Sequence, residues 1–442
     1  MKTKLIGLLG ILLTMNLLAS CGSNGSDTPN GVVTQIAPGL INHLDNFSPA
    51  AVVIGQKTLN EGGWDESGWE SNPPLLPTAS TFGNWWGMRG SPTVLNSTLY
   101  VSDYSNHRIL GFNAIPTASG RNADFVLGQP DFVTNTPGTA ADKLGYPDTV
   151  KSYDGKLFVV DHLNSRILIW NTQPTKNQSP ADVVVGQPGF GSSDLATTQT
   201  GLRYPDGMEV AAGKLIVADK HNNRVLVWNS IPTTNGAPAD LVLGQGDFTH
   251  NVSNDDNQDG IPDGGTPDGT PTARTLFEPY SVWSDGKQLI VVDMGNNRVL
   301  IWKKFPTVNF QPADIVIGQS DFTHMAFNDD NQDGVTDGPS ARVFYYPTNI
   351  SSNGTQLFIT DCNNSRVLVW DRIPKTNFAP ADTVIGQKDF IHSTPNDANH
   401  DGIEDAGPTA QTLSYPSSSY VYGNKLLVQD QGNKRYLIYD LH

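Results

Sequence analysis

The 442-residue sequence predicts an all-β fold: a six-bladed β-propeller of four-stranded blades, closed by an N-terminal strand that completes the last blade. Three observations lead to this prediction. One motif occurs six times. A second motif also occurs six times, but its first copy comes before the first complete repeat. Each repeat contains four short runs of β-type residues. No stretch of the repeats shows the periodicity of an amphipathic helix.

The first motif is Asp-x-x-Asn-x-Arg followed by alternating apolar residues. Asp and Asn bond to nearby backbone groups and tolerate left-handed conformations, so they favour a turn, after which Arg begins a strand. Because every repeat carries the motif, we interpret it as architecture and not as a functional ring of arginines. The six Asp/Asn/Arg sets are Asp103/Asn106/Arg108, Asp161/Asn164/Arg166, Asp219/Asn222/Arg224, Asp293/Asn296/Arg298, Asp361/Asn364/Arg366 and Asp430/Asn433/Arg435.

Each repeat contains four runs that are typical of strands, bounded by turn residues. In the repeat from Tyr204 to Phe248 these runs are Gly207–Val210, Lys214–Ala218, Arg224–Trp228 and Leu241–Gly244. Four strands in about 40–70 residues are typical of a propeller blade. We expect the tryptophans that end the third strand to pack in the core or between blades, and they are Trp170, Trp228, Trp302 and Trp370.

The second motif, Val-(Leu/Ile/Val)-Gly-Gln, marks the fourth strand and indicates how the ring closes. Its copies end at Gln56, Gln129, Gln187, Gln245, Gln319 and Gln387. The first copy precedes any complete repeat, whereas the last repeat, Tyr415 to Tyr439, supplies only three strands. We therefore expect Val52–Gln56 to complete the final blade, which leaves no open sheet edge.

The N-terminal region predicts export and a lipid anchor. A basic start, Met1 to Lys4, is followed by an apolar run from Leu5 to Leu18 that is too short to cross a membrane as a helix. The ending Leu-Ala-Ser-Cys resembles the bacterial lipoprotein cleavage box, which implies acylation of Cys21. The alternative is ordinary signal cleavage near a chance cysteine.

These segments predict three parts of the chain: a signal peptide over 1–20, a flexible tether over 21–47 and the propeller over 48–442. We expect a lipoprotein anchored at the bacterial cell envelope, with the outer membrane and the cell surface as open alternatives. Its contact with the membrane would be through the lipid chains only.

Charge and cysteine content exclude several classes. The formal net charge is −16, and removal of residues 1–20 takes away Lys2 and Lys4 to give −18. An acidic exported protein is a poor candidate for nucleic-acid binding. Cys362 has no partner in the mature chain except Cys21, so a disulfide framework is not available.

The repeat resembles the NHL family of β-propellers, on "YPDG…LIVADKHNNRVLVWN" and its five relatives. The resemblance covers about residues 48–442 and implies a six-bladed ring. It implies little about activity, because such rings serve as sensor ectodomains, as binding modules and occasionally as lyases. Similar rings include zinc-dependent amidating lyases and calcium-dependent lactonases, and the catalytic set of neither maps onto this sequence.

Three acidic loops predict weak calcium sites. Each reads Asp-x-Asn-x-Asp-Gly-x-x-Asp and resembles the EF-hand loop and the calcium turns of thrombospondin type-3 repeats. Position 12 is Thr266, Ser340 or Pro408, so the bidentate carboxylate of an EF-hand is missing, and water, Asp256 or Asp330 would complete the shell. The alternative is a solvated acidic loop. The expected ligands are Asp255, Asn257, Asp259, Ile261 and Asp263; Asp329, Asn331, Asp333, Val335 and Asp337; and Asp397, Asn399, Asp401, Ile403 and Asp405, where Ile261, Val335 and Ile403 offer backbone carbonyls.

The longest connection, Lys57–Ser91, is the candidate for recognising a protein or a carbohydrate. Aromatic side chains beside charges suit sugar stacking or a protein hot spot. The alternative is a plug over the mouth of the ring. The candidate ligand-binding residues are Trp64, Trp69, Trp85, Trp86 and Arg89.

Two further features leave the activity open. His250, His324 and His392 lie at equivalent places in three different blades, too far apart for a shared zinc. Cys362 occupies a turn position where the other repeats place Tyr, His, Lys, Met or Gln, which argues against a nucleophile. We expect a calcium-stabilised surface binding or scaffolding module and no identified catalytic residue. The alternative is a metal-dependent hydrolase or lyase, which acids or histidines converging on the central channel would favour.

Overall fold

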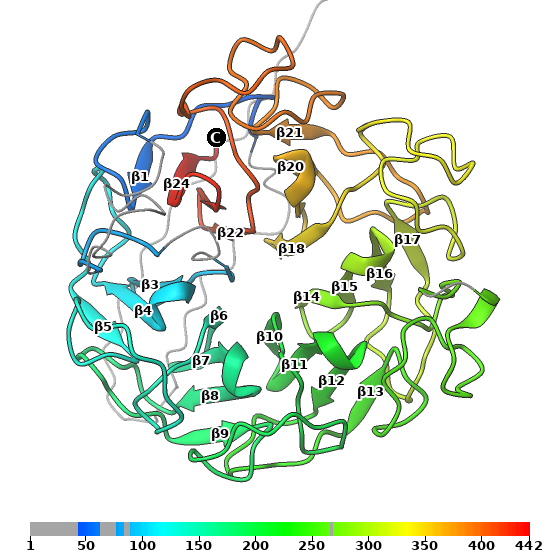
Figure 1. The fold of residues 1–442 in the computed structure, drawn as a ribbon, viewed down its shortest axis with the longest axis horizontal. Helices are drawn as coiled ribbons and strands as arrows, with labels where there is room; N and C mark the ends of the chain where they lie inside the picture. The colour runs from blue at the N-terminus through cyan, green and yellow to red at the C-terminus, as the bar shows by residue number, and fades with distance from the viewer. Residues whose placement is uncertain (1–42, 62–76, 84–88, 266–267) are drawn as a thin grey trace, which may run out of the picture. The chain divides into compact units, whose positions relative to one another are not determined.

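The computed structural model describes residues 43–61, 77–83, 89–265 and 268–442. Within these ranges the chain forms six four-stranded antiparallel sheets arranged as blades around one axis (Figure 1). The predicted fold class is therefore confirmed. No helix in the described part of the chain is long and apolar enough to cross a membrane.

Blades 1 to 5 each contain four consecutive strands. Blade 1 contains β2 (Thr93–Leu95), β3 (Thr98–Asp103), β4 (Arg108–Phe112) and β5 (Phe125–Leu127). Blade 2 contains β6 (Pro147–Tyr153), β7 (Lys156–Asp161), β8 (Arg166–Trp170) and β9 (Val183–Val185). Blade 3 contains β10 (Met208–Ala211), β11 (Lys214–Asp219), β12 (Arg224–Trp228) and β13 (Leu241–Leu243). Blade 4 contains β14 (Pro279–Ser284), β15 (Leu289–Asp293), β16 (Arg298–Trp302) and β17 (Ile315–Ile317), and blade 5 contains β18 (Pro347–Ser352), β19 (Leu357–Asp361), β20 (Arg366–Trp370) and β21 (Thr383–Ile385).

Blade 6 joins the two ends of the described chain, as the second motif predicts. It contains β22 (Ser418–Tyr422), β23 (Lys425–Asp430), β24 (Arg435–Asp440) and the N-terminal strand β1 (Val52–Ile54). β1 pairs antiparallel with β24, with Val53 opposite Leu437 (Figure 1). The pairing satisfies backbone groups that an open outer edge would expose.

The closure begins earlier in the chain than Val52. Asn46 Oδ1 accepts a hydrogen bond from Val384 N, and Phe47 N donates to Val384 O. Asn177 and Gln178 make the same two contacts with Val126 in blade 1. The segment "LDNFSPAAVVIGQ" is thus a further copy of the connector that precedes each fourth strand, so residues 43–47, which the sequence analysis assigned to the tether, contact the ring.

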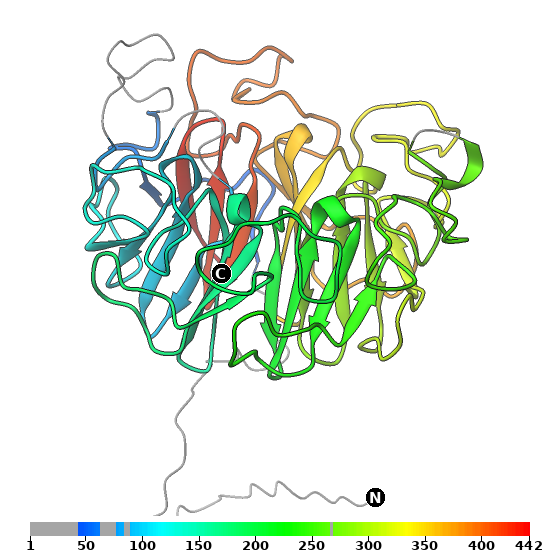
Figure 2. The same cartoon turned by 60° about the horizontal axis from the view of Figure 1, so that its bottom comes forward.

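A short turn joins the second and third strands of each blade and positions the site described below. In blade 1, β3 ends at Asp103, a single 3-10 turn η1 (Tyr104–Asn106) follows, and His107 takes a left-handed φ of 54° before Arg108 opens β4. Equivalent turns are η2 (His162–Asn164), η3 (Lys220–Asn222), η5 (Met294–Asn296) and η6 (Cys362–Asn364). These turns lie on the same face of the ring as the long connections after β17 and β21 (Figure 2).

The hydrophobic core is distributed between neighbouring blades. One buried cluster, for example, combines Val160 and Ile167 of blade 2 with Val217 and Leu226 of blade 3. The tryptophans that end the third strands are buried as predicted, and Trp228 Nε1 donates to Ala237 O at 2.9 Å. Each blade therefore covers the apolar face of the next, because a twisted sheet cannot bury both of its faces alone.

Candidate functional site at the ring axis

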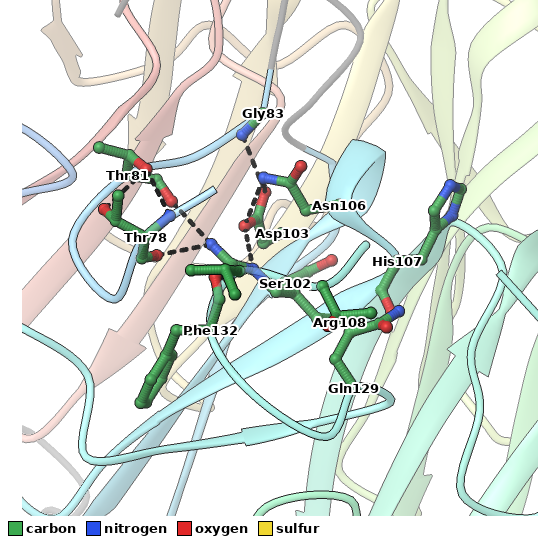
Figure 3. Close-up of polar contacts among 12 residues, drawn as sticks. Thr78, Thr81, Gly83, Ser102, Asp103, Asn106, His107, Arg108, Gln129 and Phe132 are labelled. Carbon is green, nitrogen blue, oxygen red and sulfur yellow. Dashed lines mark hydrogen bonds and ion pairs between the residues drawn. The ribbon is translucent and has the colours of Figure 1, made fainter. Parts of the chain in front are cut away.

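The Asp-x-x-Asn-x-Arg motif forms a buried polar network in every blade. In blade 1, Arg108 Nε donates to Asp103 Oδ2 at 2.6 Å, and its Nη atoms donate to the carbonyls of Phe132, Thr78 and Thr81 (Figure 3). Asn106 Nδ2 donates to the same carboxylate. All six arginines are fully buried, so they fasten connections to the blade and do not line a pore. The architectural interpretation of the motif is confirmed.

Two positions beside this network differ from blade to blade. One directly follows the motif Asp and is occupied by Tyr104, His162, Lys220, Met294, Cys362 and Gln431. The other lies at the start of the innermost strand or just before it, and it is occupied by Gly90, Asp148, Asp206, Tyr280, Thr348 and Ser417. The repeat's symmetry is therefore broken at the end of the blades that faces the axis.

Side chains at these positions meet across blade boundaries. His162 of blade 2 places Nδ1 2.7 Å from Asp206 Oδ1 of blade 3. Lys220 of blade 3 places Nζ 3.3 Å from Asp206 Oδ2 and 3.9 Å from a Glu278 carboxylate oxygen. The Lys220 ammonium also lies over the Tyr280 ring of blade 4, 4.9 Å from its centroid. One buried carboxylate thus lies within ion-pair distance of both the Lys220 ammonium and the His162 imidazole.

Arg89 completes this axial cluster from the opposite direction. Its guanidinium lies 5.3 Å from the centroid of the Tyr104 ring. The pKa of Arg89 is raised by Tyr280 and, against the effect of burial, by Asp206 and Asp148. These partners belong to blades 2, 3 and 4, whereas Arg89 leads into blade 1, and only a side chain near the axis can act on all of them. We define the axial cluster as Arg89, Tyr104, Asp148, His162, Asp206, Lys220 and Tyr280.

The two axial carboxyls have opposite pKa shifts. Burial, and then the neighbouring Asp206 carboxylate, raise the pKa of Asp148 to about 7. Burial would also raise the pKa of Asp206, but the Lys220 ammonium and His162 hold it well below its usual range. Asp148 Oδ2 has no hydrogen-bond partner among the described residues, although Thr149 donates to Oδ1. Two acids with separated pKa values in one place are typical of acid–base sites.

The Asp206 carboxylate also controls the pKa of His162. Burial lowers its pKa, but the attraction of Asp206 outweighs this effect, so the pKa of His162 is raised above its usual value. Nδ1 also lies 3.1 Å from Pro205 O, which fixes the orientation of the ring. Nε2 is therefore the nitrogen left for a ligand.

Aromatic rings surround the cluster at the mouth of the ring. Tyr146 stacks on Tyr104 with centroids 4.8 Å apart, and Tyr204 lies 5.3 Å from His162. Each tyrosine precedes a proline, Pro147 at the start of β6 and Pro205 shortly before β10, and both tyrosines hold a positive φ, 51° and 48°. A left-handed backbone is uncommon for bulky residues and requires support from its surroundings.

The sequence analysis did not select the axial cluster, apart from Arg89. Its members come from four different repeats, at most two from each, so that no single repeat shows the cluster. The one available signal was the variable position after the motif Asp, which was noted only at Cys362. Burial raises the pKa of the Cys362 thiol to about 12, so this cysteine is a weak nucleophile.

The acidic loops have the same conformation in all three copies. In the first loop, both oxygens of Asp255 accept hydrogen bonds from the backbone of Asp259 and Gly260, and Asp263 accepts from Asn257. Asp256, expected to help complete the coordination, accepts from Thr272, and Asp330 accepts from Ser340. No group of three or more His, Cys, Asp or Glu side chains arranged for a metal ion is found among the described residues. The calcium sites stay a prediction.

Each acidic loop is attached to the blade network by a reciprocal amide pair. Asn254, the first residue of the first loop, donates to Asn296 Oδ1 at 2.8 Å and accepts from Asn296 Nδ2 at 3.0 Å. The corresponding pairs are Asn328 with Asn364 and Asn396 with Asn433. In blade 2, which lacks such a loop, Asn164 donates to the backbone carbonyl of Gly138 instead. The loops are thus joined directly to the repeated network.

The other predicted residues are separate from the axis or lie outside the described residues. His250, His324 and His392 each bond through Nδ1 to an aspartate of the same blade, Asp247, Asp321 and Asp389 respectively. Cys21, Trp64, Trp69, Trp85 and Trp86 lie outside the described ranges. Of the residues predicted for ligand recognition, the structure therefore places only Arg89.

Comparison with known proteins finds only weak structural similarities. No family model matches the chain, and no curated protein matches it. Similar solved structures include Kuenenia stuttgartiensis hydrazine synthase, with 12% identity, TM-score 0.41 and coverage of 86% of this chain and 99% of that one. Virginiamycin B lyase from Staphylococcus aureus has 12% identity and a TM-score of 0.38, with coverage of 83% of this chain and 97% of that one. A nidogen–laminin complex has 15% identity and a TM-score of 0.34, with coverage of 66% of this chain and 81% of that one. At these values the similarities carry no argument about activity.

Proposed function

We propose that this protein binds a small polar molecule at the axial cluster and transfers a proton on it, as a hydrolase or a lyase does. The observation that supports the proposal is the contact between His162 and Asp206 beside Asp148, whose pKa is about 7. The Asp206 carboxylate raises the pKa of His162 above its usual value, which suits a histidine that exchanges a proton. The blade network alone requires none of these side chains.

Each residue has a role that follows from its surroundings. His162 exchanges the proton through Nε2, because Asp206 and the Pro205 carbonyl occupy Nδ1. Asp206 orients the imidazole and stabilises its charged form, as a carboxylate behind a histidine does in acyl-transfer sites. Lys220 and Arg89 stabilise negative charge that develops on the ligand. Asp206 and Asp148 are buried, so they position and tune the other groups.

The wider setting of this site is also part of the proposal. Export and acylation of Cys21 would hold the ring at the cell envelope, and bound calcium would stiffen the long connections on the same face. Membrane fractionation of the full chain and of Cys21→Ser tests the anchor, and equal release of both into the soluble fraction would rule it out. A ring that binds its ligand without changing it, as a surface binding module does, is the competing function.

Turnover of a panel of small esters, lactones and alkoxy acids by the full chain tests the catalytic proposal. Mass spectrometry would detect the products, with and without a chelator to show whether a metal takes part. His162→Gln should lower turnover by about 10²–10⁴-fold. His392→Gln is the matched control, because His392 also bonds to an aspartate through Nδ1 but lies away from the axis, and it should keep full turnover.

Two outcomes would count against catalysis. Saturable binding without product would identify a binding module. Turnover that His162→Gln leaves unchanged would place the chemistry elsewhere in the molecule.

A further inference from the structure

We infer that the ligand of the axial cluster carries a carboxylate, attached to a compact ring such as that of a sugar acid. The inference rests on the proposed function, since it assigns a chemical class to the ligand of the same site. It comes from three properties of the cluster: which charges are accessible, which aromatic faces are already covered, and how the local charge compares with that of the whole chain.

The accessible charged groups of the cluster are mostly cationic. The side chains of His162 and Lys220 remain 12% and 11% exposed, and Arg89 is half-buried. The carboxylates beneath them are inaccessible, with Asp206 fully buried and Asp148 nearly so. Glu278 is the exception, at 34% exposed. A ligand entering from the loop face therefore meets ammonium, guanidinium and imidazole groups together with the Glu278 carboxylate, while Asp206 and Asp148 lie beneath them.

A cationic ligand is disfavoured by the aromatic side chains. Tyr104 and Tyr280 offer the ring faces that would attract a positive charge. Arg89 already lies over the Tyr104 ring and Lys220 over the Tyr280 ring. The protein's own cations thus use these faces, and they would repel a second positive charge.

The local charge also differs from that of the whole chain. The sequence contains 28 Lys and Arg against 44 Asp and Glu, so cations are scarce. Arg89, Lys220 and His162 nevertheless converge on one point, where Asp206 is ionised and Asp148 has a pKa of about 7. A concentration of cations in an acidic protein creates a local attraction for anions. Carboxylates are a natural partner, because Arg and Lys form short charge-assisted hydrogen bonds with them.

The rim provides a surface for the body of the ligand. Tyr146 and Tyr204 are half-buried and lie beside Tyr104 and His162. Tyrosine combines an apolar ring face with a polar hydroxyl, which suits a compact ring bearing hydroxyl groups. The cations would hold the carboxylate, and the tyrosines would contact the ring.

Calorimetry on the full chain with D-galacturonate, D-galactose and inorganic phosphate tests this inference. Galacturonate and galactose differ by the carboxylate, and phosphate shows whether any small anion suffices. Galacturonate should bind at least about tenfold more tightly than galactose, the ratio that one charge-assisted contact gives. Lowering the pH through the pKa of His162 should tighten galacturonate binding and leave galactose unaffected.

Variants locate the carboxylate. Lys220→Met should weaken galacturonate binding about tenfold, and Lys220→Arg should restore most of it. Lys156→Met is the control, because Lys156 bonds to Asn171 on the surface away from the axis. Thermal melts of each variant show whether the fold is kept, and the Lys220→Arg arm stays informative if Lys220→Met unfolds.

Several results would overturn the inference: equal affinity for galactose and galacturonate, binding of phosphate without galacturonate, binding of none of the three, or no effect of Lys220→Met. Turnover of neutral esters or lactones that depends on His162, together with any of these results, would leave the proposed function standing without the carboxylate. If neither the preference for a carboxylate nor turnover that depends on His162 is found, the inference and the proposed function are both refuted.

Discussion

The six blade networks and the axial cluster both place cationic side chains beside buried aspartates, but the networks support the fold and the axial cluster is the candidate site. In the networks, Asp, Asn and Arg recur identically and are buried, and Arg donates both to the Asp carboxylate and to backbone carbonyls of the connections. At the axis, the adjacent position changes from Tyr to His to Lys to Met to Cys to Gln around the ring. Structure that every blade needs is repeated, whereas a site formed once requires different residues from different blades.

The largest expected effect comes from opening one network. Arg224→Met would leave the Asp219 carboxylate buried without its charged partner, and we expect a loss of about 3–5 kcal/mol in the free energy of unfolding. Chemical denaturation measures it. Arg121→Met, which breaks an exposed pair with Asp124, should cost at most about 1 kcal/mol. Similar losses for the two variants would contradict the structural role of the network.

At the axis, by contrast, removing a charge should stabilise the fold. Asp148 has a pKa of about 7 in the folded state and near 3.8 when unfolded, so the unfolded chain loses this proton first as the pH rises. Stability from this group is therefore lost between about pH 4 and pH 7. Asp148→Asn should raise the free energy of unfolding at pH 8 by about 2–4 kcal/mol while impairing activity.

Denaturation of the wild type and of Asp148→Asn at pH 4 and pH 8 checks this sign. The two proteins should differ little at pH 4 and most at pH 8. If the variant is less stable than the wild type at pH 8, Asp148 stabilises the fold as the network residues do. The two regions would then not differ in this respect.

The smallest expected effect concerns the acidic loops, which connect the two regions. If their calcium sites bind with Kd values of about 10⁻⁴–10⁻³ M, calcium at about 10 mM should add about 1.4–2.7 kcal/mol per occupied loop. Thermal melts with calcium and with a chelator measure the shift. Asn254→Ala should reduce the calcium-dependent part by uncoupling one loop from Asn296. Identical melts in calcium and in chelator would end the calcium hypothesis.

Much of the fold could be predicted because its signals are local and repeated. The turn motif requires a left-handed residue before Arg, and the structure has one in all six copies, at His107, Ser165, Asn223, Asn297, Ser365 and Lys434. The phase difference between the two motifs predicted the pairing of β1 with β24. The contact of Asn46 with Val384 was missed because the copy of the connector motif that contains Asn46 is degenerate, and only the equivalent contact of Asn177 makes it recognisable.

The sequence by itself determined the number of blades, their strands and their closure, since each rests on spacing and alternation within a repeat. Only the tertiary structure decided that Arg89, Asp148, His162, Asp206 and Lys220 converge. The physical reason is geometric. Closing the ring brings the axial ends of all blades together, so residues from separate repeats become neighbours whose burial and charge set one another's pKa. The repeats in the sequence show how many blades the ring has, but they do not show which residues meet across its axis.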